Sequence, residues 1–325
     1  SLSMKKPLVV ITDYYYESID QEQAVMAELG AELRDYHCKT EDEVIAVAAD
    51  CDALICQFAP ITRRVIESLR CCKVIVRYAI GVDNIDLKAA EERGIYVCNV
   101  PDYSIDEVSN MAIALLLDCA KKLTYLASQV KQGNCSYTVV KPLYRMEGKT
   151  LGLVGFGRIP QAVAKKVAGF GLQMLTYDPM VNEAAAKELG VTPVSLEELL
   201  ERSDYVSVHC PLLPATRHMF DREAFRKMKP TAVFINTARG AIVKEEDLVW
   251  ALENGEIAMA GIDVTETEPI PVDHPLLKLP NALVTPHAAW YSEEAVKSLQ
   301  LKVAQEVARI LGGEAPLHPV NHPKK

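Results

Sequence analysis

The sequence predicts an α/β fold in which two domains each contain a parallel sheet. Short, nearly continuous apolar runs alternate with helical patterns along most of the 325 residues, and this alternation is typical of parallel sheets covered by helices on both faces. The length suits two domains of ordinary size. A charged fraction of 24% and a hydrophobic fraction of 49% are those of a globular protein and exclude a disordered chain.

Charge and cysteine content exclude several classes of function. A net charge of −9 argues against a nucleic-acid-binding surface, which would be basic. No apolar stretch is long enough to span a membrane, the longest candidate being residues 111–117, and the N-terminal segment does not resemble a signal peptide. The nine cysteines show neither a C-x-x-C motif nor the ligand spacing of a metal site. We therefore expect reduced thiols, no bound metal and a cytoplasmic location.

The first hundred residues contain four predicted strands and three predicted helices. The strands are residues 7–12, 53–57, 73–77 and 95–98, and the helices are residues 21–29, 62–69 and 86–93. None of the connections between these elements resembles a phosphate-binding glycine turn, so we do not expect the first hundred residues to bind a nucleotide.

A proline-marked segment after residue 98 is the predicted first crossing between the domains. Pro101 interrupts the chain, and Ser104 and Glu107 have the spacing of a capping box. They predict a helix from residue 104 to about residue 130. This helix is apolar on nearly every side at residues 111–117, which suggests burial between layers or subunits. Residues 131–149 lack periodicity and predict a loop or arm.

The segment Leu151–Asp178 has the pattern of a strand, a glycine turn, a helix and a second strand. Gly155 permits a tight turn, and Gly157 lets a pyrophosphate approach the backbone at the helix N-terminus, where unpaired N–H groups attract anions. Asp178 ends the second strand about 20 residues further on, where an acid accepts hydrogen bonds from the adenosine ribose and repels a 2′-phosphate. The pattern favours NAD over NADP.

Pro160 departs from this pattern because it replaces the third glycine. The alternative to a dinucleotide site is an ordinary strand-to-helix turn, but the preceding strand, the helix and the acid favour the dinucleotide. Proline is tolerated in a first helical turn, and if the helix begins at Ile159 or later Pro160 is unstrained there. Its effect on the packing of helix against sheet stays open.

The remaining chain continues the alternation. Ser195 and Asp221 are predicted helix caps, residues 205–208, 232–236, 258–262 and 281–285 are predicted strands, and residues 292–311 form a last helix that can cross back to the first domain. We therefore predict two Rossmann-like domains. Residues 104–291 form a NAD-binding domain, inserted in a discontinuous substrate-binding (lid) domain of residues 4–103 plus 292–325.

Three polar residues follow predicted strands of the second domain. Arg239 offers a planar, bidentate cation to a carboxylate, His287 titrates in the range that suits a general acid/base, and Glu268 would orient the His287 ring. A 2-oxo acid that accepts a hydride needs such a set. Taken singly, each has a structural alternative as a surface charge, a loop residue or a buried histidine, but their joint position at strand ends favours a catalytic site.

Weaker candidates lie near other strand ends. The segment from Arg77 to Gly81 would bring backbone N–H groups and a cation to a carboxylate, or is a simple turn. The sequence His209-Cys210-Pro211 ends a strand and would line the cofactor site. Asp263 either binds the nicotinamide amide or merely terminates a strand.

Seven motifs together resemble those of the D-isomer-specific 2-hydroxyacid dehydrogenases. They are RYAIGVDNID, NVPDYSIDEV, GLVGFGRI, VSVHCPL, FINTARGAIV, GIDVTETEP and TPHAAWYSEE, and they extend from Arg77 to Glu294 in the family's order and spacing. The sequence is most similar to the branch around the C-terminal-binding proteins and the phosphoglycerate dehydrogenases.

The resemblance implies roles for individual residues. Arg239 would bind and polarise the substrate, Glu268 would pair with His287 as the general acid/base, and Trp290 would narrow the pocket. The backbone amides of Ile80 and Gly81, with Arg77, would hold the substrate carboxylate. The implied cofactor contacts are Gly155, Gly157, Arg158, Ile159, Asp178, Cys210, Pro211, Thr216, Thr237, Ala238, Asp263 and His287. Homodimers built on the NAD-binding domain are usual in the family.

The residues and the resemblance are compatible with two functions. The first is an NAD-dependent oxidoreductase that interconverts a small D-2-hydroxy acid and its 2-oxo acid. The second is a corepressor-like dimeric protein that senses NADH with little or no turnover. A 3-phosphoglycerate substrate would need extra cations, for which Arg63, Arg64 and Lys73 are candidates.

Overall fold

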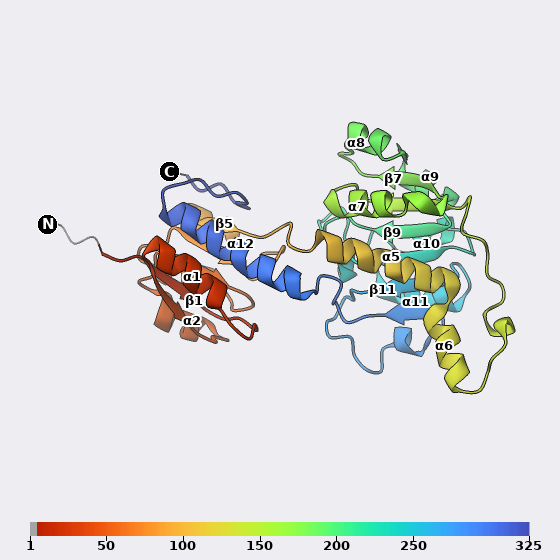
Figure 1. Cartoon of the computed structure of the whole chain (residues 1–325), viewed down its shortest axis with the longest axis horizontal. Coiled ribbons are helices and arrows are strands. Elements are labelled where there is room, and N and C mark those ends of the chain that lie inside the picture. The colour runs from red at the N-terminus through yellow and green to blue at the C-terminus, as the bar shows by residue number, and fades with distance from the viewer. Residues whose placement is uncertain (1–4, 325) are drawn as a thin grey trace. The chain divides into compact units, whose positions relative to one another are not determined.

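The computed structural model describes residues 5–324, which divide into two compact units (Figure 1). Unit 1 consists of residues 5–103 together with residues 292–324, and unit 2 of Ser104–Tyr291. Each unit contains one sheet, and every strand pair in both sheets is parallel. The prediction of two α/β domains with parallel sheets is confirmed.

Unit 1 has a five-stranded sheet in the order β2-β1-β3-β4-β5. Its strands are β1 (Leu8–Ile11), β2 (Glu32–Asp35), β3 (Ala53–Cys56), β4 (Val74–Arg77) and β5 (Tyr96–Cys98). Helices α1 (Asp20–Leu29) and α12 (Glu293–Leu311) lie side by side on one face, and α2 (Glu41–Ala48), α3 (Arg63–Ser68) and α4 (Leu87–Glu92) cover the other (Figure 1).

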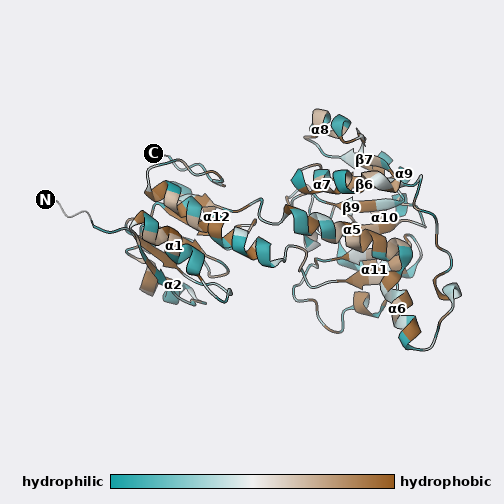
Figure 2. Ribbon diagram, in the orientation of Figure 1, coloured by the Kyte–Doolittle hydropathy of each residue, from teal (hydrophilic) through white to brown (hydrophobic). Residues whose placement is uncertain are grey.

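Alternating residues of the central strands explain these two layers. Val9 points into the cluster that contains Met26 of α1 and Val303 of α12, whereas Val10 points into the cluster that contains Val44 of α2. Strands buried on both faces are apolar throughout, and Figure 2 shows the apolar colour concentrated on strands and inner helix faces.

Unit 2 has a seven-stranded sheet in the order β12-β11-β10-β9-β6-β7-β8. Its strands are β6 (Thr150–Val154), β7 (Gln173–Tyr177), β8 (Val191–Pro193), β9 (Tyr205–Val208), β10 (Val233–Asn236), β11 (Met259–Ile262) and β12 (Ala282–Val284). Helices α5 (Ile105–Lys121) and α7 (Arg158–Lys166) pack on one face, while α9 (Leu196–Arg202), α10 (Arg222–Lys227) and α11 (Glu245–Glu253) pack on the other (Figure 1). No helix in residues 5–324 has both the length and the apolar character that a bilayer crossing requires.

The helix predicted from residue 104 to about residue 130 is in fact two helices. Lys122 adopts the left-handed conformation with φ of 52° and separates α5 from α6 (Leu123–Lys131). The Asp118 carboxylate accepts hydrogen bonds from the N–H and the hydroxyl of Thr124, so it caps α6 and favours the break. The Ser104 half of the predicted capping box is also wrong, because Ser104 precedes α5 without a side-chain capping bond.

Five elements were not predicted, and most lie where the local signal is weak. Strands β2 and β8 are edge strands with exposed residues, and α2 and α8 (Glu183–Glu188) are short helices capped by Thr40 and Asn182. Helix α11 begins at Glu245, and the preceding Lys244 provides no side-chain cap. The predicted caps Ser195 and Asp221 are confirmed, since their side chains accept from Glu198 N and Ala224 N.

Each sheet has one point where the chain reverses its direction of winding. In unit 2 this switch point lies between β6 and β9, and in unit 1 between β1 and β3. Ligands of open α/β sheets bind outside the carboxyl ends of the strands at such points. A cofactor is therefore expected beside the residues that follow β6 and β9.

In unit 1 an internal carboxylate fills the equivalent place. Asp13, just after β1, accepts hydrogen bonds from the N–H groups of Gln57, Phe58 and Ala59, which follow β3, at 3.0, 2.7 and 3.1 Å. These N–H groups would otherwise attract a phosphate, so this unit has no free anion site at its switch point.

Candidate active site

The glycine turn after β6 is shaped by close contact with the neighbouring strand. Gly155 has φ of 98°, and a Cβ there would lie 2.8 Å from the carbonyl carbon and oxygen of His209. No atom lies within 4 Å of the Cβ position of Gly157, so a ligand has room above it. A tight turn closed on one side and open on the other fits a bound pyrophosphate.

Helix α7 starts at Arg158, one residue before the earliest start considered from the sequence. Its first backbone bond runs from Gln161 N to Gly157 O at 3.2 Å. Pro160 precedes that donor and is buried, so its missing N–H removes no bond of the helix. The anion-binding end of α7 is intact despite the proline.

Asp178 follows β7 and is held by the glycine turn. Its carboxylate accepts from Phe156 N at 2.9 Å and from Met180 N at 2.8 Å, one bond on each oxygen. Each oxygen retains an acceptor site, since a carboxylate offers about four in all. This arrangement suits the two hydroxyls of an adenosine ribose.

The carboxyl end of β9 presents uncharged groups. Burial lowers the pKa of His209 to about 4, and its Nε2 lies 2.7 Å from Ser207 Oγ. Burial raises the pKa of the Cys210 thiol to about 11. Both side chains are therefore neutral at neutral pH. Pro211 and Thr216 are joined by a hydrogen bond of 2.6 Å from the Thr216 hydroxyl to the Pro211 carbonyl.

Thr237, after β10, carries an unsatisfied polar atom. Its Oγ1 is buried and has no hydrogen-bond partner among the residues that the structure describes. Buried hydroxyls are rarely unpaired, so this atom is suited to a ligand. Together with Gly155, Gly157 and Asp178, it indicates that the residues present fit a dinucleotide such as NAD.

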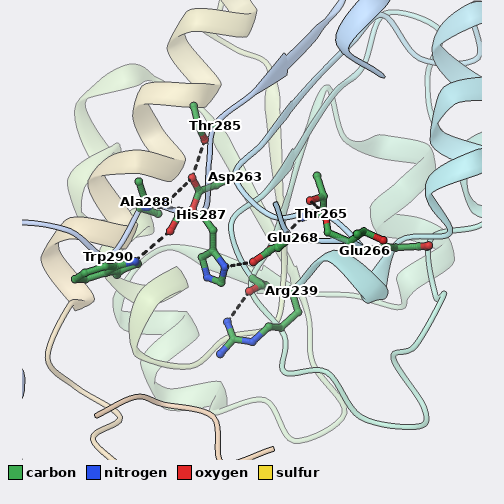
Figure 3. Close-up of polar contacts among 12 residues, drawn as sticks. Arg239, Asp263, Thr265, Glu266, Glu268, Thr285, His287, Ala288 and Trp290 are labelled. Atoms are coloured by element: carbon green, nitrogen blue, oxygen red, sulfur yellow. Dashed lines mark hydrogen bonds and ion pairs between the residues drawn. The ribbon is translucent and has the colours of Figure 1, made fainter. Parts of the chain in front are cut away.

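The structure brings Glu268 and His287 together (Figure 3). The Glu268 carboxylate lies 2.6 Å from His287 Nδ1, and the two side chains are 38% and 40% exposed. Because an ionised carboxylate only accepts, Nδ1 carries the proton of this bond and Nε2 is left to exchange a proton with another group. Both side chains come from loops after β11 and β12, as expected from the sequence.

Asp263 and Trp290 hold the backbone at His287, where φ is 55°. The Asp263 carboxylate accepts from the Thr285 hydroxyl at 2.7 Å and from the N–H groups of Ala288 and Ala289 at 3.0 Å. The Trp290 indole N–H donates to the His287 carbonyl at 3.1 Å (Figure 3). These bonds fix the turn that presents the imidazole. The contact of Asp263 with the nicotinamide and the role of Trp290 as a wall of the pocket stay predictions.

Arg239 follows β10 and is half-buried. One of its guanidinium nitrogens donates to the Ala238 carbonyl at 2.7 Å. Figure 3 shows the guanidinium directed to the same region as the His287 ring. A cation and a proton donor are thus presented side by side, the pair that a 2-oxo acid needs.

In unit 1, Arg77 is only 8% exposed, and its guanidinium organises the loop after β4. It donates to the Gly81 carbonyl at 2.9 Å and to the Asp83 carboxylate at 2.8 Å. Asn99, which the sequence did not single out, donates to the Ile80 carbonyl at 2.8 Å. Within residues 5–324 the N–H groups of Ile80 and Gly81 have no hydrogen-bond partner. The loop therefore offers two amide donors to an anion.

Comparison with known proteins identifies the family. Residues 113–289 match the model described as "D-isomer specific 2-hydroxyacid dehydrogenase, NAD binding domain". The chain belongs to the D-isomer-specific 2-hydroxyacid dehydrogenase family. It is an NAD-dependent oxidoreductase, and the cofactor that the glycine turn and Asp178 predict is confirmed as NAD.

Several relatives of this dehydrogenase have names that describe an activity. A glyoxylate reductase of Korarchaeum cryptofilum is 43% identical over 86% of this chain and 85% of its own. A D-3-phosphoglycerate dehydrogenase of Methanocaldococcus jannaschii is 37% identical over 97% of this chain, which spans 59% of that protein. The structure of a D-lactate dehydrogenase with NAD+ from Lactobacillus jensenii has a TM-score of 0.81 at 26% identity and covers 97% of this chain and 100% of that one.

Proposed function

We propose that this dehydrogenase interconverts a small, unphosphorylated D-2-hydroxy acid and its 2-oxo acid, with His287 as the general acid/base. The observation that carries the proposal is the 2.6 Å pair of Glu268 and His287 beside the Arg239 guanidinium. When bound, NADH supplies the hydride for the carbonyl carbon of the 2-oxo acid. The protein must then supply a proton and a site for negative charge.

His287 is suited to move the proton. Its Nδ1–H is donated to Glu268, so Nε2 is the atom that gives a proton to the forming hydroxyl and takes it back in the reverse direction. The Glu268 carboxylate also fixes the orientation of the ring that gives this proton. The His287 N–H donates to the Asp263 carbonyl and the Trp290 indole donates to the His287 carbonyl, and these bonds keep the ring in place.

Arg239 is suited to bind the 2-oxo acid. Its guanidinium is planar and always charged, so it can hold a carboxylate and polarise the adjacent carbonyl. In unit 1, we assign the amide N–H groups of Ile80 and Gly81 to binding a substrate carboxylate, and Arg77 and Asn99 to holding the carbonyls of this loop.

The surroundings of unit 1 support a substrate without a phosphate. Arg63 and Arg64 each pair with carboxylates. Lys73 lies at the amino end of β4, whereas Ile80 follows its carboxyl end. Arg63 and Arg64 are thus already neutralised, and Lys73 lies at the other end of the strand, so none of the three offers an unengaged cation to a phosphate near Ile80. Glyoxylate and hydroxypyruvate, the acids in the names of two relatives, are therefore the proposed substrates.

NADH oxidation with glyoxylate, hydroxypyruvate, pyruvate and 3-phosphohydroxypyruvate tests the proposal. We expect turnover with one or more of the first three, and loss of at least a hundredfold in kcat on His287→Gln with NADH binding retained. Binding of NADH without turnover of any 2-oxo acid would refute the enzyme and favour the NADH-sensing alternative. For that alternative, we expect the oligomer measured with NADH to differ in size from the oligomer measured without it.

We also propose a homodimer formed by unit 2. Helix α5 buries its core-facing apolar residues, whereas α6 has no buried residue and exposes Leu123 by 61% and Val130 by 56%. Tyr137 and Tyr144 in the following arm are 73% and 57% exposed. So much apolar surface on one segment is typical of a contact with a second copy. Sedimentation of Leu123→Glu should show a monomer if this surface is the interface.

The cytoplasmic location expected from the sequence is likewise a proposal. All nine cysteines are free, and six of them are buried. Unpaired thiols are typical of a reducing compartment. In residues 5–324 no group of three or more His, Cys, Asp or Glu side chains is arranged to hold a metal ion.

A further inference from the structure

Two carboxylates outside the reacting groups exchange hydrogen bonds with each other's backbone. The N–H of Glu245 donates to Glu266 Oε1 at 2.9 Å, and the N–H of Glu266 donates to Glu245 Oε2 at 2.9 Å. Glu245 is the first residue of α11, and Glu266 lies in the loop after β11. We call this reciprocal pair the carboxylate clamp.

The clamp stabilises both helix α11 and the loop after β11. Helix α11 has no local side-chain cap, so Glu266 satisfies one of its unpaired N–H groups and places a negative charge at the positive end of the helix dipole. Bonds from N–H groups to ionised carboxylates are about twice as strong as neutral ones. The clamp therefore joins the loop after β11 firmly to the helix.

Two histidines complete the charge distribution around the clamp. His274 Nδ1 accepts from Leu276 N at 3.1 Å, so its Nε2 carries the proton that is donated to Glu245 Oε1 at 2.7 Å. His218 Nε2 lies 3.2 Å from Glu266 Oε1. Each carboxylate thus has a backbone N–H and an imidazole as partners.

The clamped loop also carries Glu268. Thr265 N donates to Glu268 Oε1 at 3.3 Å, which leaves Glu268 Oε2 for His287 at 2.6 Å. The backbone of Thr265 packs so closely on Gly240 that a Cβ at Gly240 would lie 2.1 Å from it. The clamp at Glu266 and the contact of Thr265 with Gly240 therefore both hold this loop. Gly240 is the residue that follows Arg239.

Glu266 itself does not reach the reacting groups. Figure 3 shows its side chain extending away from His287. Any influence on the reaction must therefore pass through the backbone of residues 265–268 and the position of the Glu268 carboxylate.

We propose that Glu266, held by Glu245, is a positioning residue that sets the distance between Glu268 and His287. The inference rests on the proposed role of His287 as general acid/base. A displaced Glu268 no longer holds the proton on Nδ1, so Nε2 is not reserved for the substrate. The chemical step then slows, while the sites of NADH and of the substrate carboxylate are untouched.

The first experiment compares Glu266→Ala with a matched control. Glu246→Ala removes the neighbouring carboxylate of α11, which is 76% exposed and pairs only with Lys244 among the described residues. We expect Glu266→Ala to lower kcat at least tenfold, with KM for the 2-oxo acid and Kd for NADH within threefold of wild type. Glu246→Ala should match wild type, and Glu266→Gln, which keeps an acceptor for Glu245 N, should recover most of kcat.

A double-mutant cycle shows whether Glu266 acts through Glu268. If it does, Glu266→Ala combined with Glu268→Gln has the kcat of Glu268→Gln alone within twofold. Multiplicative losses, or a Glu266→Ala variant with the kcat of Glu246→Ala, would overturn the proposal.

A readout without turnover separates this inference from the proposed function. The ¹⁵N shifts of the His287 ring, assigned by their loss in His287→Gln, report the fraction of molecules with the proton on Nδ1. We expect that fraction to fall in Glu266→Ala and to be unchanged in Glu246→Ala. An unchanged fraction in Glu266→Ala refutes the positioning role, whereas absence of turnover in the wild type refutes the proposed function.

Discussion

Replacing His209 should remove a large part of the acid sensitivity of unit 2. Burial lowers the pKa of His209 from its usual 6.5 to about 4. Between these values the unfolded chain binds a proton that the folded chain does not. His209 therefore does not lower the free energy of unfolding above pH 6.5, and it lowers this free energy progressively as the pH falls from 6.5 toward 4.

The size of the effect follows from the two pKa values. One pKa unit corresponds to about 1.4 kcal/mol, and the difference of about 2.5 units costs at most about 3.5 kcal/mol at low pH. At pH 5 the linkage relation gives a loss of about 2 kcal/mol relative to pH 7. The variant His209→Gln, whose amide can still bond Ser207, carries no titrating group and should lack this loss.

Urea unfolding followed by tryptophan fluorescence measures the difference. Both tryptophans, Trp250 and Trp290, lie in unit 2, so the signal reports this unit. The free energy of unfolding of wild type relative to His209→Gln should fall by about 2 kcal/mol from pH 7 to pH 5. His37→Gln, which removes an exposed histidine of unit 1, is the control. Parallel pH dependences of wild type and His209→Gln would refute the reasoning.

Three further substitutions test the turn geometry and cofactor choice. Gly240→Ala places a Cβ 2.1 Å from the Thr265 backbone, so it should lower the free energy of unfolding by about 3 kcal/mol or more; an alanine variant as stable as wild type in urea would contradict the close contact. Asp178→Ser should lower the ratio of kcat/KM for NADH over NADPH at least tenfold, or about 1.4 kcal/mol, because the repulsion of the 2′-phosphate is removed; an unchanged ratio would exclude that role. Pro160→Gly should change NAD affinity by less than tenfold in a fluorescence titration, since α7 loses no bond at Pro160, and a larger gain would show that the proline distorts the turn.

Local patterns predicted those parts of the fold whose stabilising contacts are themselves local. The strand, glycine turn and helix around Gly155 could be predicted because each residue there reflects its own backbone geometry. Edge strand β2, with the sequence ELRD, could not be predicted, since pairing with β1 and not burial maintains it.

Helix α11 shows the limit most clearly. Its cap is the Glu266 carboxylate, 21 residues further along the chain from Glu245, and no local pattern contains that contact. Similarly, Asp118 ends α5 by bonding Thr124, although the apolar periodicity continues beyond Lys122.

The candidate site was predictable to the extent that parallel strands expose their carboxyl ends at one edge. That rule places Arg239, Glu268 and His287 after β10, β11 and β12. The 2.6 Å distance between Glu268 and His287, and the use of Asp263 and Trp290 to hold the turn, depend on tertiary contacts. The chemical roles of these residues stay predictions.

The Asp13 carboxylate gives the two units different dependence on the cofactor. In unit 1 the N–H groups of the loop after β3 already bond to the Asp13 carboxylate, so they need no ligand to be satisfied. Unit 2 leaves Thr237 Oγ1 and the end of α7 to be satisfied by a ligand. Because a ligand stabilises what it binds by RT ln(1 + [L]/Kd), we expect added NAD to raise the resistance of unit 2 to proteolysis more than that of unit 1.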